Sequence, residues 1–207
     1  MMLFAHIGIT LGLVWLPYRV VSGVSSGAAR PKPGGDSHVG APAGRASGSG
    51  RFRFPVAGPD YRLVLAGSML PDIIDKPLGT WIMRDILSDG RVYSHTLLFS
   101  VVLLAIGLVL YATRGQWAGL WLAFGSIVHL CLDQMWLNPV TFLWPAFGWR
   151  FPVVDTSGWV ERVFSNLFRE PGVYVPEIIG FLLLAAFALD VIRRRKVVSF
   201  LRVGVAD

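Results

Sequence analysis

Long apolar runs constrain the fold of this chain more than any other feature of its sequence. Four runs of about 18 to 21 residues carry almost no charge, at positions 3–21, 96–113, 117–137 and 173–192. Because an α-helix rises about 1.5 Å per residue, such runs are long enough to cross a hydrocarbon core of about 30 Å. Charged residues make up only 15% of the chain, against about 25% in soluble domains. We therefore predict an all-α integral membrane protein, a helical bundle with four to five transmembrane segments.

A fifth apolar run, at positions 63–70, is too short to cross the membrane alone. Asp60 and Arg62 limit its extension towards the N-terminus, and Pro71 ends it. Two interpretations fit this run: a short tilted span, or a half-inserted helix buried among its neighbours. The first run lacks the basic start and the clean cleavage site of a signal peptide. We expect a retained transmembrane helix there, with a signal anchor as the alternative.

Composition divides the rest of the chain into distinct parts. Residues 22–50 are dominated by Gly, Ser and Pro, which bury too little apolar surface to fold by themselves. A basic stretch, residues 193–196, follows the apolar run at 173–192. Trp144, Trp149 and Trp159 precede that run and fit the membrane interface. The predicted domains are a first transmembrane helix (1–21), a flexible linker (22–55), a membrane bundle (56–192) with an interfacial segment (138–172), and a basic cytoplasmic tail (193–207).

Basic residues lie beside the apolar runs rather than in one patch, although the formal net charge is +6. This placement follows the positive-inside rule and argues against nucleic acid as a partner. With an outward N-terminus and five crossings, 13 of the 19 Lys and Arg residues fall on the inner side and 6 on the outer side. That count favours a crossing by residues 63–70. It predicts a protein of the bacterial inner (cytoplasmic) membrane, whose partner is the lipid bilayer and whose tail is cytoplasmic.

The chain contains a single cysteine, Cys131, so no disulfide can form within it. The redox compartment is therefore left open. The apolar surroundings of Cys131 favour a small buried hydrophobe, and a metal ligand is the alternative.

Six ionisable residues lie inside or directly beside apolar runs. Each costs at least ~2.5 kcal/mol in a membrane and therefore marks a candidate functional position. His129 and Asp133 are four residues apart and share one helix face, where Gly125 and Ser126 would let another helix approach closely. Such a pair suits a shared metal ion; a structural hydrogen bond is the alternative. The six residues are His6, Asp72, Asp75, His95, His129 and Asp133.

Asp72 and Asp75 follow Pro71, which is favourable at the first position of a helix. Three residues apart, the two carboxylates lie on one side of a turn and repel each other unless a cation sits between them. Helix capping combined with surface charge is the alternative. His95 opens the next apolar run, where the helix dipole favours a neutral, metal-binding ring. The alternative for His95, and for His6, is a residue that only marks the membrane boundary.

The predicted orientation brings these three His and three Asp residues to the outer side of the membrane. There they form a candidate site for one or two divalent metal ions, most readily Zn²⁺ or Mn²⁺. A metal ion would lower the pKa of a water molecule and so create a hydroxide nucleophile. Asp75 or Asp133, if not fully engaged as a ligand, could serve as the general base.

Four short stretches of the chain resemble the YdjM-like family of inner-membrane proteins, which are described as metal-dependent hydrolases. The stretches are His-Ile-Gly-Ile-Thr at 6–10, Gly-Ser-Met-Leu-Pro-Asp-Ile-Ile-Asp at 67–75, Ser-His-Thr-Leu-Leu-Phe at 94–99 and His-Leu-Cys-Leu-Asp at 129–133. The resemblance covers roughly residues 1–149 without the linker. It implies a metal-dependent hydrolase and offers the six residues above as its polar signature, but it supplies no substrate.

Two classes of function remain open from the sequence. The first is a membrane-bound hydrolase that attacks an ester or phosphoester of an amphiphilic, lipid-like substrate, because a site at the outer membrane surface suits such a molecule. The second is non-enzymatic: intramembrane His and Asp also build ion and proton paths in transporters. A membrane protein that a bound metal ion merely stabilises is a third interpretation.

Overall fold

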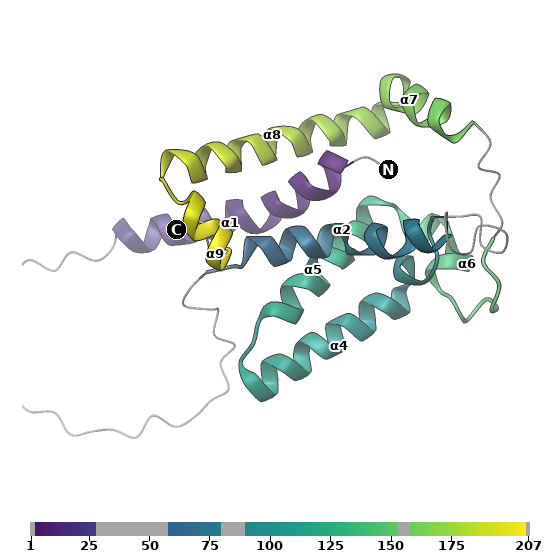
Figure 1. Ribbon diagram of the computed structural model, residues 1–207, viewed down its shortest axis with the longest axis horizontal. Coiled ribbons are helices and arrows are strands. Elements are labelled where there is room, and N and C mark those ends of the chain that lie inside the picture. Colours follow the sequence, from purple (N-terminus) through teal and green to yellow (C-terminus); the bar gives the residue numbers. More distant parts are fainter. Residues whose placement is uncertain (1–2, 28–57, 80–89, 153–157, 206–207) are drawn as a thin grey trace, which may run out of the picture.

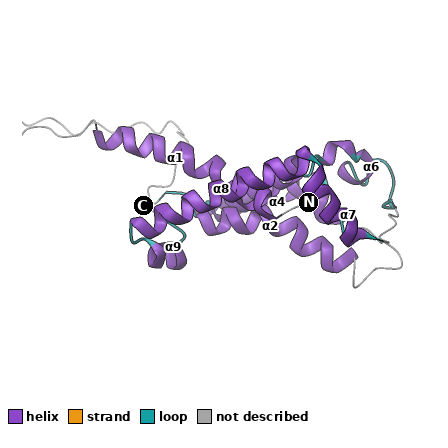
Figure 2. Ribbon diagram, turned by 90° about the horizontal axis from the view of Figure 1, so that it is seen from above, coloured by secondary structure: helices purple, strands orange, loops and turns teal. Residues whose placement is uncertain are grey.

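The computed structural model describes residues 3–27, 58–79, 90–152 and 158–205, and within these ranges it contains helices and loops but no strand (Figure 2). Most of the predicted linker lies outside the described residues. The helices are η1 (Ala5–Ile9, a π-helix), α1 (Thr10–Gly27), α2 (Tyr61–Pro77), η3 (Tyr93–His95), α4 (Leu97–Arg114), α5 (Ala118–Leu132), η4 (Met135–Leu137), α6 (Pro139–Phe142), α7 (Trp159–Arg169), α8 (Pro171–Arg193) and α9 (Val197–Val203).

Five long helices lie side by side, in the order α8, α1, α2, α5, α4 (Figure 1). Arg19, halfway along α1, pairs with Asp190 near the end of α8, with 3.4 Å between Nη2 and Oδ1. The backbone N–H of Tyr61, at the start of α2, donates to the carbonyl of Gly204 beyond α9. These contacts define one end of the bundle, the tail end. The opposite end, where α2 and α5 finish and α4 and α8 begin, is called the site end.

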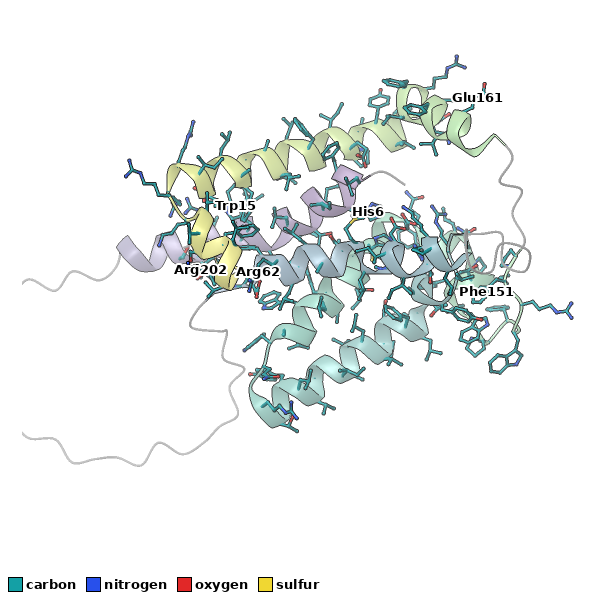
Figure 3. The ribbon with its side chains drawn as sticks, in the orientation of Figure 1. His6, Trp15, Arg62, Phe151, Glu161 and Arg202 are labelled. Carbon is teal, nitrogen blue, oxygen red and sulfur yellow. The ribbon has the colours of Figure 1, made fainter. Side chains whose placement is uncertain are left out.

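The tail end is closed by an apolar core and by the returning α9. Leu11, Tyr61, Phe187 and Val191 form a buried cluster there, and Trp15 packs against it. Arg62 donates to the carbonyl oxygens of residues 201 and 202, and Figure 3 shows Arg62 and Arg202 next to each other. Helix α9 is therefore fastened to the start of α2, and the predicted tail is partly folded.

The sequence prediction for the short fifth run is corrected by the structure. The helix runs from Tyr61 to Pro77, 17 residues, and it continues through Pro71 rather than beginning there. At about 1.5 Å per residue it is about 26 Å long. Pro71 is tolerated because it is buried in a packed helix whose neighbours hold its shape. In the same way, the run at 117–137 forms α5 only as far as Leu132.

Two of the described helices, α4 and α8, are long and apolar enough to cross a membrane by length and composition, and α5 is a shorter apolar helix. Only 11% of the apolar window of α4 and 22% of that of α8 is buried inside the protein. A soluble protein would cover such helices, so their exposed apolar faces fit a lipid solvent. The prediction of an all-α membrane bundle is confirmed.

Pairs of glycines set how closely the helices approach. A Cβ atom at Gly125 would lie 2.6 Å from the backbone nitrogen of Ser68 and from the carbonyl oxygen of Val64, both on α2. A Cβ atom at Gly107 of α4 would lie 2.8 to 3.0 Å from the backbone of α5, whose Gly119 faces it. Small residues permit such contacts in membrane bundles. The predicted close approach at Gly125 is confirmed, whereas the prediction that Cys131 is buried is wrong, since its side chain is exposed.

Aromatic side chains gather around the site end. Tyr93, Trp144 and Phe151 pack with ring centroids 5.0 to 5.7 Å apart. Helix α7 carries Phe164 and Phe168 one turn apart, with 57% and 76% of their surfaces exposed. An amphipathic helix with exposed aromatic residues is typical of a membrane interface. Trp144, Phe151, Phe164 and Phe168 lie in the segment 138–172, for which the sequence predicts an interfacial position.

Replacement of Gly125 by Val should separate α2 from α5, because the new side chain would overlap the α2 backbone. We expect a loss of about 1–3 kcal/mol of stability, measured by thermal unfolding in detergent. Gly172→Val is the matched control, since a Cβ at Gly172 meets no atom within 4 Å. Equal unfolding temperatures for the two variants would contradict the proposed contact.

Candidate metal centre

The structure brings all six predicted residues into one buried cluster at the site end of the bundle. Their exposed fractions are 7% or less except that of Asp72, which is half-buried. Figure 3 shows His6 inside the bundle, between the ends marked by Arg62 and Phe151. The cluster draws on four elements: His6 lies in η1, Asp72 and Asp75 on α2, His95 at the end of η3, His129 on α5, and Asp133 directly after α5.

Asp75 acts as the anchor of the loop that precedes α4. Its carboxylate accepts hydrogen bonds from the backbone N–H groups of Val92, Ser94 and His95 at 2.8 to 3.1 Å. It also lies 2.8 Å from Nδ1 of the His95 ring. A fully buried carboxylate needs such partners, because an unpaired one is strongly destabilised. Asp75 therefore fixes both the loop and the orientation of His95.

His129 is oriented in the same manner by a backbone carbonyl. Its Nδ1 lies 2.7 Å from the carbonyl oxygen of Ser68 on α2. A carbonyl only accepts hydrogen bonds, so this Nδ1 carries the proton and Nε2 presents a lone pair. The same holds for His95, whose Nδ1 donates to Asp75. Holding one ring nitrogen with a carboxylate or carbonyl is the usual outer-shell arrangement of metal-binding histidines.

The Nε2 atoms of His95 and His129 face each other at 3.3 Å. Two lone pairs at that distance repel, so the pair is stable only with a positive charge shared between them, either a proton on one ring or a metal ion. Burial lowers the pKa of His95, but the carboxylates of Asp72 and Asp75 outweigh that effect and the pKa is raised overall. The surroundings of His95 therefore favour a cation.

Two further carboxylates complete the cluster. Asp72 Oδ1 lies 3.6 Å from His95 Nε2 and 3.9 Å from His129 Nε2, while its Oδ2 accepts from Lys76 Nζ at 2.7 Å. Asp133 Oδ1 lies 3.0 Å from His6 Nε2. The second oxygen of Asp133 is 3.8 Å from His95 Nε2. Imidazole nitrogens and carboxylate oxygens therefore converge on a small volume.

This donor set fits one tetrahedral metal ion. Two imidazole nitrogens bound at about 2.0–2.1 Å to such an ion lie about 3.3 Å apart, which is the observed Nε2 separation. Within the described part of the chain, two groups of residues could hold a metal ion, and both include His129. Because Nδ1 of His129 is taken by Ser68, its single Nε2 lone pair binds only one ion. The geometry thus favours one ion over two ions that each use His129. The two groups are His6, His129 and Asp133, and Asp72, His95 and His129.

The contacts of Asp75 do not match the role that the sequence predicts for it, which is that of a metal ligand or general base. Its oxygens are occupied by backbone N–H groups and by the His95 ring, so it lies behind that ring rather than facing the donors. Asp72 contacts Lys76, whereas Asp75 accepts from backbone N–H groups and the His95 ring. Their spacing in the sequence indicated a shared side of the helix but not what each oxygen contacts.

Three residues that contribute to the cluster escape the sequence analysis. Arg91 Nε lies 3.0 Å from Asp133 Oδ2. Ser68 contributes only its carbonyl, which no side-chain pattern reveals. Buried Glu177 on α8 accepts the N–H groups of residues 4 and 5, which fixes the start of η1 and so the position of His6. Glu177 could have been found from the sequence, because an acidic residue inside an apolar run indicates a buried, paired position. Arg91 could not, because it lies outside the apolar runs, where charged residues are common.

The chain is similar to a family of known membrane proteins. Residues 35–197 match the family model described as YdjM inner membrane protein. The match contains Asp72, Asp75, His95, His129 and Asp133, and it begins after His6. No curated protein and no solved structure matches the chain.

Replacement of Asp75 by Asn should weaken metal binding although Asp75 faces away from the donors. The amide would offer one acceptor oxygen where the carboxylate has two, and it would loosen the His95 ring. Loss of such an outer-shell partner typically costs about 10–100-fold in metal affinity. The affinity is measured by competition with a chelator of known strength. Asp190→Asn, which removes a carboxylate paired with Arg19 and Arg194 at the tail end, is the control and should leave the metal affinity unchanged.

Proposed function

The chain belongs to the YdjM family of inner membrane proteins, and we propose from this premise that it is a metal-dependent hydrolase embedded in the membrane. It would cleave an ester or phosphoester bond of an amphiphilic substrate. The observation that carries the proposal is the pair of Nε2 atoms 3.3 Å apart, each held by a bond at Nδ1, with carboxylates beside them. A hydrogen-bonded structural core does not require two imidazole lone pairs to face each other.

His95, His129 and Asp72 would hold the ion, a divalent metal such as Zn²⁺ or Mn²⁺. When bound, that metal supplies Lewis-acid chemistry, polarising the bond to be cleaved and activating water. His6 Nε2 and Asp133 Oδ1 lie 3.0 Å apart beside these donors. We assign to this pair the removal of the proton from the attacking water, because a carboxylate in contact with an imidazole can accept and hold it. Asp75 is a positioning residue.

The surroundings of the cluster support an amphiphilic substrate. Exposed aromatic side chains lie at the same end of the bundle: Trp136, Phe147, Trp149, Phe164 and Phe168. Aromatic residues concentrate at the level of lipid headgroups. A substrate with an apolar chain would remain in the lipid while its polar group enters the cluster. In this arrangement the site end faces outward and the basic tail is cytoplasmic, as the distribution of basic residues predicts.

Transport by the same His and Asp residues is the rival function. A proton or ion path needs polar groups along the whole membrane depth. In the described part of the chain, the cluster lies towards one end, and the tail end is filled by the apolar core of Leu11, Tyr61, Phe187 and Val191. This one-sided placement favours a catalytic site.

Two substitutions separate ligation from catalysis. His129→Ala should remove the bound transition metal and abolish hydrolysis, since it deletes one of the two facing nitrogens. Asp133→Asn should keep the metal but slow hydrolysis by about 10²–10⁴-fold, because proton transfer is lost. Elemental analysis and turnover of an amphiphilic ester are measured on each purified variant, with Asp190→Asn as control. Flux through sealed vesicles without turnover would instead establish a transporter.

Helix α7 provides a separate test of the amphiphilic substrate. The double variant Phe164→Ser/Phe168→Ser should reduce kcat/KM severalfold for a long-chain ester in vesicles, because α7 would leave the interface. A short, water-soluble ester should be hydrolysed at the wild-type rate, since neither Phe residue touches the cluster. An equal effect on both substrates would show that α7 only stabilises the fold.

A further inference from the structure

Two cationic side chains lie at the exposed rim of the cluster. The Arg91 side chain is 35% exposed and the Lys76 side chain 50% exposed, whereas the carboxylates that they contact, Asp133 and Asp72, are 3% and 12% exposed. The two cations belong to one rim, because a Cβ at Gly90 would lie 3.5 Å from Lys76 Cγ. Among the described residues, these two cations are therefore the partly exposed side chains that contact the buried carboxylates.

The charges of the cluster do not balance once a divalent ion is present. Asp72, Asp75 and Asp133 carry three negative charges, whereas Lys76 on Asp72 and Arg91 on Asp133 carry two positive charges. With neutral histidines the cluster therefore has one net negative charge. A divalent ion converts this to one net positive charge. An uncompensated charge in a buried site is strongly unfavourable, so the loaded centre favours a ligand that brings one negative charge.

Arg91 has the geometry to bind such a ligand. Its contact with Asp133 uses Nε, and among the described residues no partner is found for its two terminal nitrogens. A guanidinium presents its N–H groups in a planar fork that matches the oxygens of a phosphoryl group. An ionised phosphodiester carries one negative charge, whereas a carboxylic ester is neutral.

We propose that Arg91 is a specificity-determining residue that binds the phosphoryl group of the substrate, so that the centre selects phosphoesters over carboxylic esters. This inference rests on the proposed hydrolase function and gives it a substrate class. Lys76 stays on Asp72 and adds to the positive potential at the rim. The phosphoryl group belongs either to a lipid headgroup or to a soluble phosphate ester, and the chemistry of recognition is the same for both.

Binding of inorganic phosphate to the metal-loaded, full-length protein tests the recognition step without requiring catalysis. Arg91→Gln should weaken phosphate binding by about tenfold or more, the usual effect of losing a charged hydrogen bond. The phosphate affinity of Arg91→Lys should lie between those of Arg91→Gln and the wild-type protein. Metal content is measured on each variant. Arg169→Gln on α7 is the matched control, since Arg169 is an exposed cation away from the cluster. Unchanged phosphate affinity in both Arg91 variants, with metal retained, would overturn the proposal.

A pair of substrates with the same leaving group distinguishes recognition from mere positioning of Asp133. For Arg91→Gln, the ratio of kcat/KM for a nitrophenyl phosphodiester to that for a nitrophenyl carboxylic ester should fall about tenfold. An equal loss on both substrates means that Arg91 only positions Asp133, and the inference fails. If the protein hydrolyses neither substrate but still binds phosphate in a way that depends on Arg91, the proposed hydrolase function is wrong and the proposed anion site is supported.

The source of the phosphoryl group is resolved by competition. Micelles containing phosphatidylglycerol should displace inorganic phosphate from the wild-type protein if the group is a lipid headgroup. Failure of the lipid to compete, while glycerol phosphate does, assigns a soluble phosphate ester. Both results uphold the phosphoryl site, whereas displacement by neither compound contradicts it.

Discussion

The close contact between α2 and α5 is the constraint on which the rest of the structure depends. Gly67 and Gly125 remove the side chains that would hold the two backbones apart. Only at that separation does the Ser68 carbonyl reach Nδ1 of His129 at 2.7 Å. The contact therefore sets both the helix packing and the direction in which His129 presents its second nitrogen. A wider spacing would leave a buried ring nitrogen without a partner, which membrane interiors do not tolerate.

Asp75 extends this order from helix α2 to the loop before α4. A single buried carboxylate accepts three backbone N–H groups and a ring N–H, so the N–H groups of residues 92, 94 and 95 are paired although η3 is only one short turn. The arrangement turns an expensive buried charge into a positioning device. Glu177 plays a comparable part at the other side, where it accepts the first N–H groups of η1 and holds His6 near Asp133. Carboxylates thus organise the cluster from two directions.

The bundle separates two chemical environments along its length. Its tail end combines an apolar core with arginines that bind helix ends and carbonyls, as in the contacts of Arg19 and Arg62. Its site end combines buried polar donors with exposed aromatic residues. This difference between the two ends suits the proposed enzyme, because the apolar part of an amphiphilic substrate would remain in the lipid beside the site end. It also explains why α4 and α8 keep so little of their surface inside the protein.

The sequence by itself determined the class of the protein and the identity of its unusual residues. Apolar length and the cost of placing charge in a membrane are local properties, so they can be read without a structure. They were sufficient to single out His129 and Asp133 and to anticipate the close approach at Gly125. They were not sufficient to assign roles, because a role depends on which atoms of distant segments meet. Only the tertiary structure decided that Asp75 holds a loop, that Arg91 reaches Asp133, and that α2 continues through Pro71. Hydrogen bonds and close packing over long sequence separations carry no periodic signal along the chain, and this is the physical reason for the division.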